Sequence, residues 1–117
     1  MPIRNNLKIL FWGSSDFSVF VLEEMEKCGL LPSVIITSPD KPKGRNLIMT
    51  PPPAKIWGEN KKIKIYQPEK LQDFDIEENF DLGIVVSYGK IIPEKLLNKP
   101  AHKTINIHPS LLPKYRG

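Results

Sequence analysis

Short apolar runs recur along the chain, and most of them end at a turn residue. Residues 7–12 (LKILFW) end at Gly13, and residues 32–37 contain the β-branched run Val-Ile-Ile-Thr. Apolar runs of about four to eight residues bounded by turn residues are typical of buried strands. The pattern therefore predicts strands at residues 7–12, 32–37, 63–66, 81–87 and 104–108.

Helical spacing appears between these strands. The apolar side chains of residues 17–28 recur at the spacing of one helix face: Phe17, Phe20, Val21, Met25 and Cys28. Serine and aspartate at positions 14–16 can cap this helix, and Gly29 is a typical helix stop. Further short helices are predicted at residues 54–60 and 93–98, and a helical turn or two within residues 69–80. Cys28 is expected to pack against the core.

Residues 38–53 have a different character. They contain five prolines and three basic side chains, and their apolar positions follow no sustained period. Loops longer than about 12–15 residues in compact domains are usually functional or disordered. We expect a long loop here.

The elements alternate between strand and helix, and the strands are apolar on both faces. This order predicts an α/β fold with an open, doubly wound parallel sheet that is covered by helices. Ligands of such sheets bind beyond the carboxyl ends of the strands, so we expect the chemistry at those ends.

Composition limits the class of protein. The 117 residues fit one modest domain, with 40% hydrophobic and 26% charged residues, and these values are typical of soluble globular proteins. A single cysteine allows no internal disulfide and no cysteine-based zinc site. No apolar run reaches the roughly 20 residues of a membrane span, and no signal peptide is evident. We expect a cytoplasmic protein that does not bind membranes.

The formal net charge of +4 is unevenly distributed. Basic residues crowd residues 41–64, where Glu59 is the only acid: Lys41, Lys43, Arg45, Lys55, Lys61, Lys62 and Lys64. Such a patch can neutralise the phosphates of a nucleic acid. A solvated surface is the commoner origin of such a patch, and the charge pattern alone favours it.

The end of the first strand lacks a nucleotide-binding motif. Gly13 is followed by no second glycine until Gly29, so neither the dinucleotide fingerprint nor a phosphate-binding loop is present. A dinucleotide cofactor is therefore disfavoured, and we expect Gly13 to serve a tight turn.

The last predicted strand carries the residues that are best suited to catalysis. Asn106 and His108 are two residues apart, so both side chains share one face of the strand, and Ile105 and Ile107 are expected to point into the core. An amide can stabilise an oxyanion, and an imidazole can move protons near neutral pH. The pair suits direct acyl transfer, but on spacing alone a polar pair that caps the strand is commoner. No metal site is expected, because His102 and His108 lack a third ligand.

The segment Asn106-Ile-His-Pro-Ser-Leu-Leu-Pro113 resembles the signature of the folate-dependent formyltransferases. Within this family, residues 11–18 (FWGSSDFS), 38–45 (SPDKPKGR) and 86–93 (VSYGKIIP) resemble the members that act on methionyl-tRNA. The likeness runs in one register from about Lys8 to Gly117. It implies a Rossmann-like domain that transfers a formyl group from 10-formyltetrahydrofolate to the α-amino group of initiator Met-tRNA.

The resemblance also implies roles for individual residues. Asn106 and His108 match two members of the catalytic trio. The folate pocket would be lined by the following residues: Tyr88, Gly89, Ile91, Ser110, Leu111, Leu112 and Pro113. Lys41, Lys43 and Arg45 match a basic loop that meets the tRNA acceptor end. No metal is implied, and the full-length form would be a monomer.

The third catalytic residue of the family, an aspartate further downstream, has no counterpart in this chain. The resemblance therefore implies that residues 1–117 are the N-terminal portion of the catalytic domain, truncated after the fifth strand, with the remainder and a C-terminal domain absent. We expect the fragment alone to be weak or inactive. The alternatives are formyl transfer to a small amine, such as a glycinamide ribonucleotide or an amino sugar, and a non-catalytic folate- or RNA-binding remnant.

Overall fold

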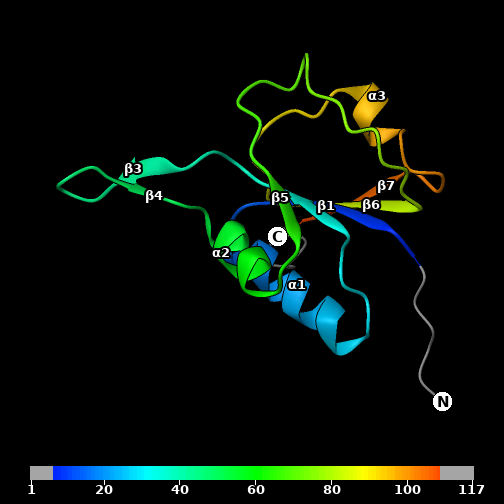
Figure 1. Ribbon diagram of the computed structural model, residues 1–117, viewed down its shortest axis with the longest axis horizontal. Coiled ribbons are helices and arrows are strands. Elements are labelled where there is room, and N and C mark those ends of the chain that lie inside the picture. The colour runs from blue at the N-terminus through cyan, green and yellow to red at the C-terminus, as the bar shows by residue number, and fades with distance from the viewer. Residues whose placement is uncertain (1–6, 109–117) are drawn as a thin grey trace, which may run out of the picture.

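The computed structural model describes residues 7–108, and a parallel sheet forms its centre (Figure 1). The strands of this sheet are β1 (Ile9–Gly13), β2 (Val34–Ile36), β5 (Lys64–Tyr66), β6 (Leu82–Val86) and β7 (Thr104–Ile107). Their order is β5-β2-β1-β6-β7, and every neighbouring pair is parallel. The predicted open parallel α/β sheet is therefore confirmed, and β1 lies at its middle.

Helices α1 (Asp16–Lys27) and α2 (Pro53–Asn60) cover one face of the sheet (Figure 1). The buried core on this face is built from both helices and from the strands: Ile9, Phe11, Leu22, Met25, Ile35, Ala54, Ile84 and Val86. Complete burial of a side chain of valine to phenylalanine size contributes about 1.5–3 kcal/mol. This layer therefore fixes both helices against the sheet, with the start of α1 directly after the end of β1.

The opposite face is covered by residues 69–80 and by α3 (Glu94–Leu97) (Figure 1). Its buried core consists of Leu10, Trp12, Val34, Ile36, Leu71, Ile76, Phe80, Val85, Tyr88, Ile92 and Leu96. Alternate residues of β1 thus enter opposite layers, as the continuous apolar run in the sequence requires.

Residues 69–80 contain bends but no helix, so the helical turn predicted there is wrong. The sheet buries Leu71, Ile76 and Phe80 from this segment. At about 100° per residue, a helix would turn Ile76 by about 140° and Phe80 by about 180° from Leu71. An irregular chain buries all of them on one side, and a helix cannot.

Helix α1 is turned about its axis relative to the predicted face. Its N-cap is Ser15, whose hydroxyl accepts the backbone N–H of Ser18 at 3.3 Å. Its buried residues are Ser18, Leu22 and Met25. Phe20 is 56% exposed and Cys28 is exposed, so the predicted packing of these two side chains is wrong. The reason is Ser18, whose hydroxyl donates a hydrogen bond to the carbonyl of Val86 and turns this side of the helix toward the sheet.

Residues 41–50 form an antiparallel hairpin, which we call the arm, and the long loop expected there is corrected. Its strands, β3 (Lys41–Lys43) and β4 (Ile48–Thr50), pair only with each other and project away from the sheet (Figure 1). The turn closes where the N–H of Leu47 donates to the carbonyl of Gly44 at 3.1 Å, and Gly44 has a φ of 78°. Pro42 is compatible with β3 because each strand of a two-stranded ribbon has an unpaired outer edge.

Gly13 ends β1 at a close approach to its neighbours, and only Ser14 and Ser15 separate it from the start of α1. A Cβ atom there would lie 2.6 Å from the carbonyl oxygen of Val86 and 2.7 Å from the hydroxyl of Ser18. Gly13 pairs with Val86 in the sheet. The missing side chain lets α1 and β6 meet beside the end of β1.

Candidate active site

Asn106 and His108 lie where the carboxyl ends of β6 and β7 meet. With Val85 and the turn after β6, they line a cleft of about 340 Å³. The turn contributes Ser87, Tyr88, Gly89, Lys90 and Ile91. The structure thus brings the candidate pair and the turn residues singled out in the sequence to one cleft.

Strand β7 is the last strand of the sheet on this side, and this explains its exposure. Asn106 and His108 are both exposed, and neither side chain is hydrogen-bonded to another residue of the described range 7–108. Ile107 packs against the core, as expected, but Ile105 is 50% exposed, so its predicted burial is wrong. A strand with one neighbour leaves its second flank uncovered within residues 7–108.

Tyr88 supports the cleft from the core. Its side chain is 3% exposed and packs edge-to-face on Trp12, with ring centroids 5.3 Å apart. Burial raises the pKa of Tyr88 to about 12. Its hydroxyl has no hydrogen-bond partner among the described residues. The phenol therefore stays neutral at physiological pH. Its buried ring supports the residues that line the cleft.

The backbone after Tyr88 turns outward. Ser87 and Gly89, on either side of Tyr88, have φ values of 51° and 93°. Glycine adopts this region at little cost, whereas serine adopts it rarely. The chain then presents Ile91, which is 93% exposed. An apolar side chain this exposed at the mouth of a cleft can contact a flat apolar ligand.

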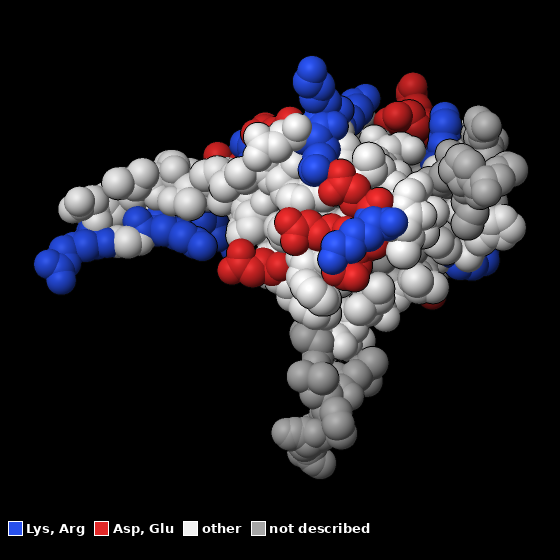
Figure 2. Space-filling model, turned by 90° about the horizontal axis from the view of Figure 1, so that it is seen from below, with Lys and Arg blue, Asp and Glu red and all other residues white. Residues whose placement is uncertain are grey.

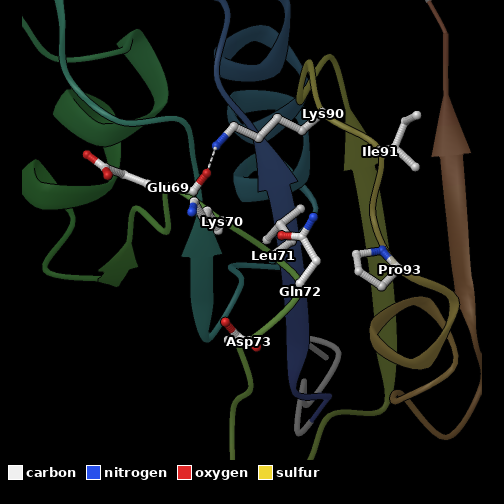
Figure 3. A pocket seen from close by; sticks show the side chains of 8 residues that line it. All are labelled: Glu69, Lys70, Leu71, Gln72, Asp73, Lys90, Ile91 and Pro93. Carbon is white, nitrogen blue, oxygen red and sulfur yellow. Dashed lines mark hydrogen bonds between the residues drawn. The ribbon is translucent and has the colours of Figure 1, made fainter.

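Lys90 connects this turn to the segment after β5 (Figure 3). Its ammonium group donates to the carbonyl oxygens of Pro68 at 3.2 Å and Glu69 at 2.8 Å. Next to it lies a cleft of about 640 Å³, lined by Glu69, Lys70, Leu71, Gln72, Asp73, Lys90, Ile91 and Pro93. The sequence offered no signal for Lys90, because its partners are backbone carbonyls about 20 residues away, and no side-chain pattern marks a carbonyl.

A third cleft, of about 190 Å³, lies between the arm and the sheet, and we call it the arm cleft. It is lined by hydroxyls, two lysines and prolines, and by no acid: Ser14, Ser15, Ser38, Pro39, Lys41, Lys43, Thr50, Pro51, Pro52 and Pro53. Lys41 pairs with Thr50 and Lys43 with Ile48, so these residues share one face of the arm. Figure 2 shows basic side chains along one side of the arm and at its end.

Ser14 links the arm cleft to the cleft of Asn106 and His108, a role that the sequence did not predict. Its hydroxyl accepts the N–H of Ser38 at 3.0 Å and the hydroxyl of Thr37 at 3.2 Å, and it donates to the carbonyl of Tyr88 at 3.4 Å. The available signal was position: Ser14 and Ser38 follow the first two strands, and parallel strands end at one edge of the sheet.

The described part of the chain contains no cluster suited to a metal ion. Within residues 7–108, no three His, Cys, Asp or Glu side chains lie close enough together to share one. None of the helices in this range has the length and apolar character that crossing a membrane requires.

Comparison with known proteins adds an independent observation. A sequence profile described as formyl transferase matches residues 7–117. The chain belongs to the formyl transferase family. The match includes the segment that carries Asn106 and His108.

The chain is similar to curated proteins named methionyl-tRNA formyltransferase. It is 44% identical to that of Halalkalibacterium halodurans over 116 residues, which is 95% of this chain and 37% of that protein. It is 44% identical to that of a Sulfurihydrogenibium species over 117 residues, 95% of this chain and 38% of that protein. The relative from Thermotoga neapolitana is 43% identical over 116 residues, 95% and 37% of the two chains. The chain thus spans well under half the length of these relatives.

The residues assigned from the sequence fall into distinct places in the structure. Lys41 and Lys43 face the arm cleft, and Arg45 is exposed at the end of the arm. Asn106 and His108 share their cleft with the turn after β6. Ser110, Leu111, Leu112 and Pro113 lie outside the described residues.

Proposed function

We propose that this formyl transferase takes part in moving a formyl group from 10-formyltetrahydrofolate to the α-amino group of initiator methionyl-tRNA. Similarity to the methionyl-tRNA formyltransferases supports the choice of acceptor. The observation that carries the proposal is that Asn106 and His108 line one open cleft at the carboxyl edge of the sheet. An amide and an imidazole are groups that acyl transfer to an amine can use.

We further propose that residues 1–117 are the N-terminal portion of the catalytic domain. In the whole enzyme, the rest of that domain would add an aspartate to the pair, and a C-terminal domain would follow. The share of the relatives that the chain spans supports this division, at 37% for the protein from Halalkalibacterium halodurans.

The proposed reaction forms one bond and breaks another at the formyl carbon. The amine nitrogen of the acceptor attacks this carbon, and the bond from the carbon to the folate nitrogen then breaks. The oxygen gains negative charge in the tetrahedral intermediate, where the side-chain N–H of Asn106 would donate to it. The amine loses a proton and the folate nitrogen gains one, and His108 would hold or relay that proton. No covalent enzyme intermediate is required.

The folate would lie across the turn after β6. Gly89 and the exposed Ile91 offer a surface for the flat ring system, and Tyr88 supports this surface from the core. Ser110, Leu111, Leu112 and Pro113 are proposed to contact the same ligand. A cleft with apolar walls and a few polar groups is typical of cofactor-sized ligands.

The tRNA would meet the arm. Residues 41–50 contain Lys41, Lys43 and Arg45 and no acid, so they carry a local positive charge. The lysines on the cleft face would neutralise phosphates of the acceptor end, which provides affinity that depends on salt. The absence of any carboxylate from the lining of the arm cleft supports this assignment.

The test uses a chimera in which the part of the Halalkalibacterium halodurans relative that follows the matched segment is joined to Gly117. We expect Asn106→Ala and His108→Ala each to lower kcat for Met-tRNA formylation by about 100-fold or more, because each removes an oxyanion or proton-transfer group. The matched control is His102→Ala, an exposed histidine outside this cleft. A change within twofold for both site variants would contradict the assigned roles.

A further inference from the structure

The arm has no core that could hold its direction. Every residue of β3 is exposed, and β4 is exposed apart from the half-buried Thr50. Neither strand pairs with the five-stranded sheet. The direction in which the arm leaves the body is therefore set where it begins and ends.

Asp40 lies directly before the arm and accepts two hydrogen bonds from the body of the molecule. The side-chain amide of Gln67 donates to its carboxylate at 2.7 Å, and the ammonium group of Lys55 donates to the same oxygen at 3.3 Å. Gln67 follows β5, and Lys55 is on α2. We call Asp40, Lys55 and Gln67 the root clamp.

The root clamp connects both ends of the arm. On the outgoing side, the Gln67 amide also donates to the carbonyl of Ser38 at 3.0 Å, so it spans the bend that leads into β3. On the returning side, Lys55 lies in the first turn of α2, which begins at Pro53, the last of the three prolines that follow β4. One carboxylate thus joins the outgoing chain to the helix that receives the returning chain.

The clamp is partly shielded from water. The side chains of Lys55 and Asp40 are 21% and 33% exposed. The hydrogen bond from Gln67 lowers the pKa of Asp40, with a further contribution from Lys55 that together outweighs partial burial. Asp40 is therefore a carboxylate at neutral pH and accepts from both donors.

We propose that the root clamp positions the arm for RNA, with Asp40 as the positioning residue that holds the basic face at a fixed angle to the sheet edge. The inference rests on the proposed function of the arm. Asp40 is a negative charge beside a basic surface, but we expect it to favour the binding of a polyanion.

This effect has the opposite sign to simple electrostatics. Asp40→Asn removes one negative charge next to the arm, so charge alone predicts tighter binding of RNA. Loss of the clamp predicts weaker binding, because the arm must then be ordered when RNA binds. The sign of the change therefore distinguishes positioning from charge.

The first measurement is backbone 15N relaxation of the 117-residue chain without RNA. We expect Asp40→Asn to increase the fast motion of residues 41–50 and to leave the amides of β1 and β6 unchanged. The control is Glu24→Gln, which removes the same charge from an exposed ion pair with Lys27 on α1. The double variant Asp40→Lys with Lys55→Asp restores the ion pair in reverse. A Gln67 amide rotated to present its oxygen to the new ammonium group loses its hydrogen bond to the Ser38 carbonyl, so we expect only part of the order of the arm to return.

The second measurement is the affinity of the same variants for deacylated initiator tRNA at one fixed salt concentration. We expect Asp40→Asn to weaken binding by about threefold to tenfold, Glu24→Gln to leave it unchanged or slightly tighter, and the reversed pair to recover part of it. Gln67→Leu, which removes both amide hydrogen bonds and no charge, is the second test if Asp40→Asn does not fold.

Each outcome decides the question. An arm as ordered in Asp40→Asn and Gln67→Leu as in the unmodified chain would overturn the clamp. A looser arm with weaker tRNA binding supports both the clamp and the proposed function of the arm. A looser arm with unchanged or tighter tRNA binding supports a clamp that orders the arm but overturns its role in RNA positioning.

Discussion

At the scale of single residues, Trp12 and Tyr88 stand out because each buries a polar atom without a partner. The indole N–H and the phenol hydroxyl have no hydrogen-bond partner among residues 7–108. An unpartnered buried polar group costs about 1–3 kcal/mol. The ring of Tyr88 therefore stabilises the fold by packing on Trp12, whereas its hydroxyl makes no contact that stabilises the described fold.

Tyr88→Phe should keep or increase stability. The change removes an unpartnered hydroxyl and keeps the ring, so we expect the free energy of unfolding at pH 7 to stay equal or to rise by up to about 1 kcal/mol. Urea denaturation measures this. A loss of more than about 1 kcal/mol would mean that the hydroxyl is hydrogen-bonded in solution.

The same variant should change the response to alkali. The pKa of Tyr88 is about 12 in the folded chain, against an ordinary value of about 10. Between these values the unfolded chain releases the proton and the folded chain keeps it, so stability falls as pH rises. Tyr88→Phe should flatten this fall in urea denaturation at rising pH, and an unchanged fall would contradict the burial of the phenol.

Gly13→Ala should destabilise the chain by about 1–3 kcal/mol. The new Cβ would lie within 2.7 Å of the carbonyl oxygen of Val86 and of the Ser18 hydroxyl, and neither can move without disturbing the sheet. The control is Gly58→Ala, whose nearest neighbours are two flexible isoleucine side-chain ends. Denaturation curves in which Gly13→Ala costs no more than Gly58→Ala would contradict the close approach.

At the scale of elements, the arm is a hairpin where the composition of the sequence predicted a loop. Five prolines in residues 38–53 predicted a loop, because proline is depleted in sheets. A two-stranded ribbon has no central strand, so Pro42 fits it. In residues 69–80, the apolar residues predicted helical turns, and the structure has none. The sheet beneath this segment determines which of its residues are buried, and local spacing does not.

Excision of the arm should separate binding from folding. Replacing residues 42–49 with Asn-Gly leaves Lys41 and Thr50 joined by a two-residue turn that hairpins favour. The removed residues are all exposed, so we expect the free energy of unfolding to change by less than about 0.5 kcal/mol.

The affinity of this excised chain for initiator tRNA should fall, and its dependence on salt should become shallower, because fewer phosphates are neutralised. Binding titrations at two salt concentrations measure both effects. Unchanged affinity and unchanged salt dependence would place the RNA contact elsewhere on the chain.

At the scale of the whole molecule, the candidate functional residues lie near the carboxyl ends of the strands. The order β5-β2-β1-β6-β7 brings the carboxyl ends of β1 and β2 beside the arm, and those of β6 and β7 beside Asn106 and His108. Ser14 connects the two regions through hydrogen bonds to Ser38 and Tyr88. An acceptor bound along the arm and a donor bound at the turn after β6 would thus approach the same edge.

The isolated 117-residue chain should not catalyse formylation at a measurable rate. The proposed mechanism needs a third group from the part of the catalytic domain beyond this chain. Measuring formyl-Met-tRNA formation with the isolated chain and with the chimera, at equal concentrations, tests this. Turnover by the isolated chain close to that of the chimera would show that Asn106 and His108 suffice.

The sequence by itself determined the parallel α/β class, the approximate position of each strand of the main sheet, and the pairing of Asn106 with His108 on one strand face. These follow from local periodicity, since alternation and apolar run length are properties of neighbouring residues. It also carries the motif that resembles the formyl transferase family, and the profile match confirms the family.

The tertiary structure decided the features that depend on residues distant in sequence. It decided which face of α1 packs on the sheet, with Ser18 buried. It left Ile105 half-exposed on β7 and buried the Tyr88 ring. It also placed Asp40 within hydrogen-bond distance of Lys55 and Gln67. These outcomes follow from close packing and from pairing of polar groups across the sheet, where the partner is set by strand order. Strand order depends on long-range contacts, and local sequence does not encode it.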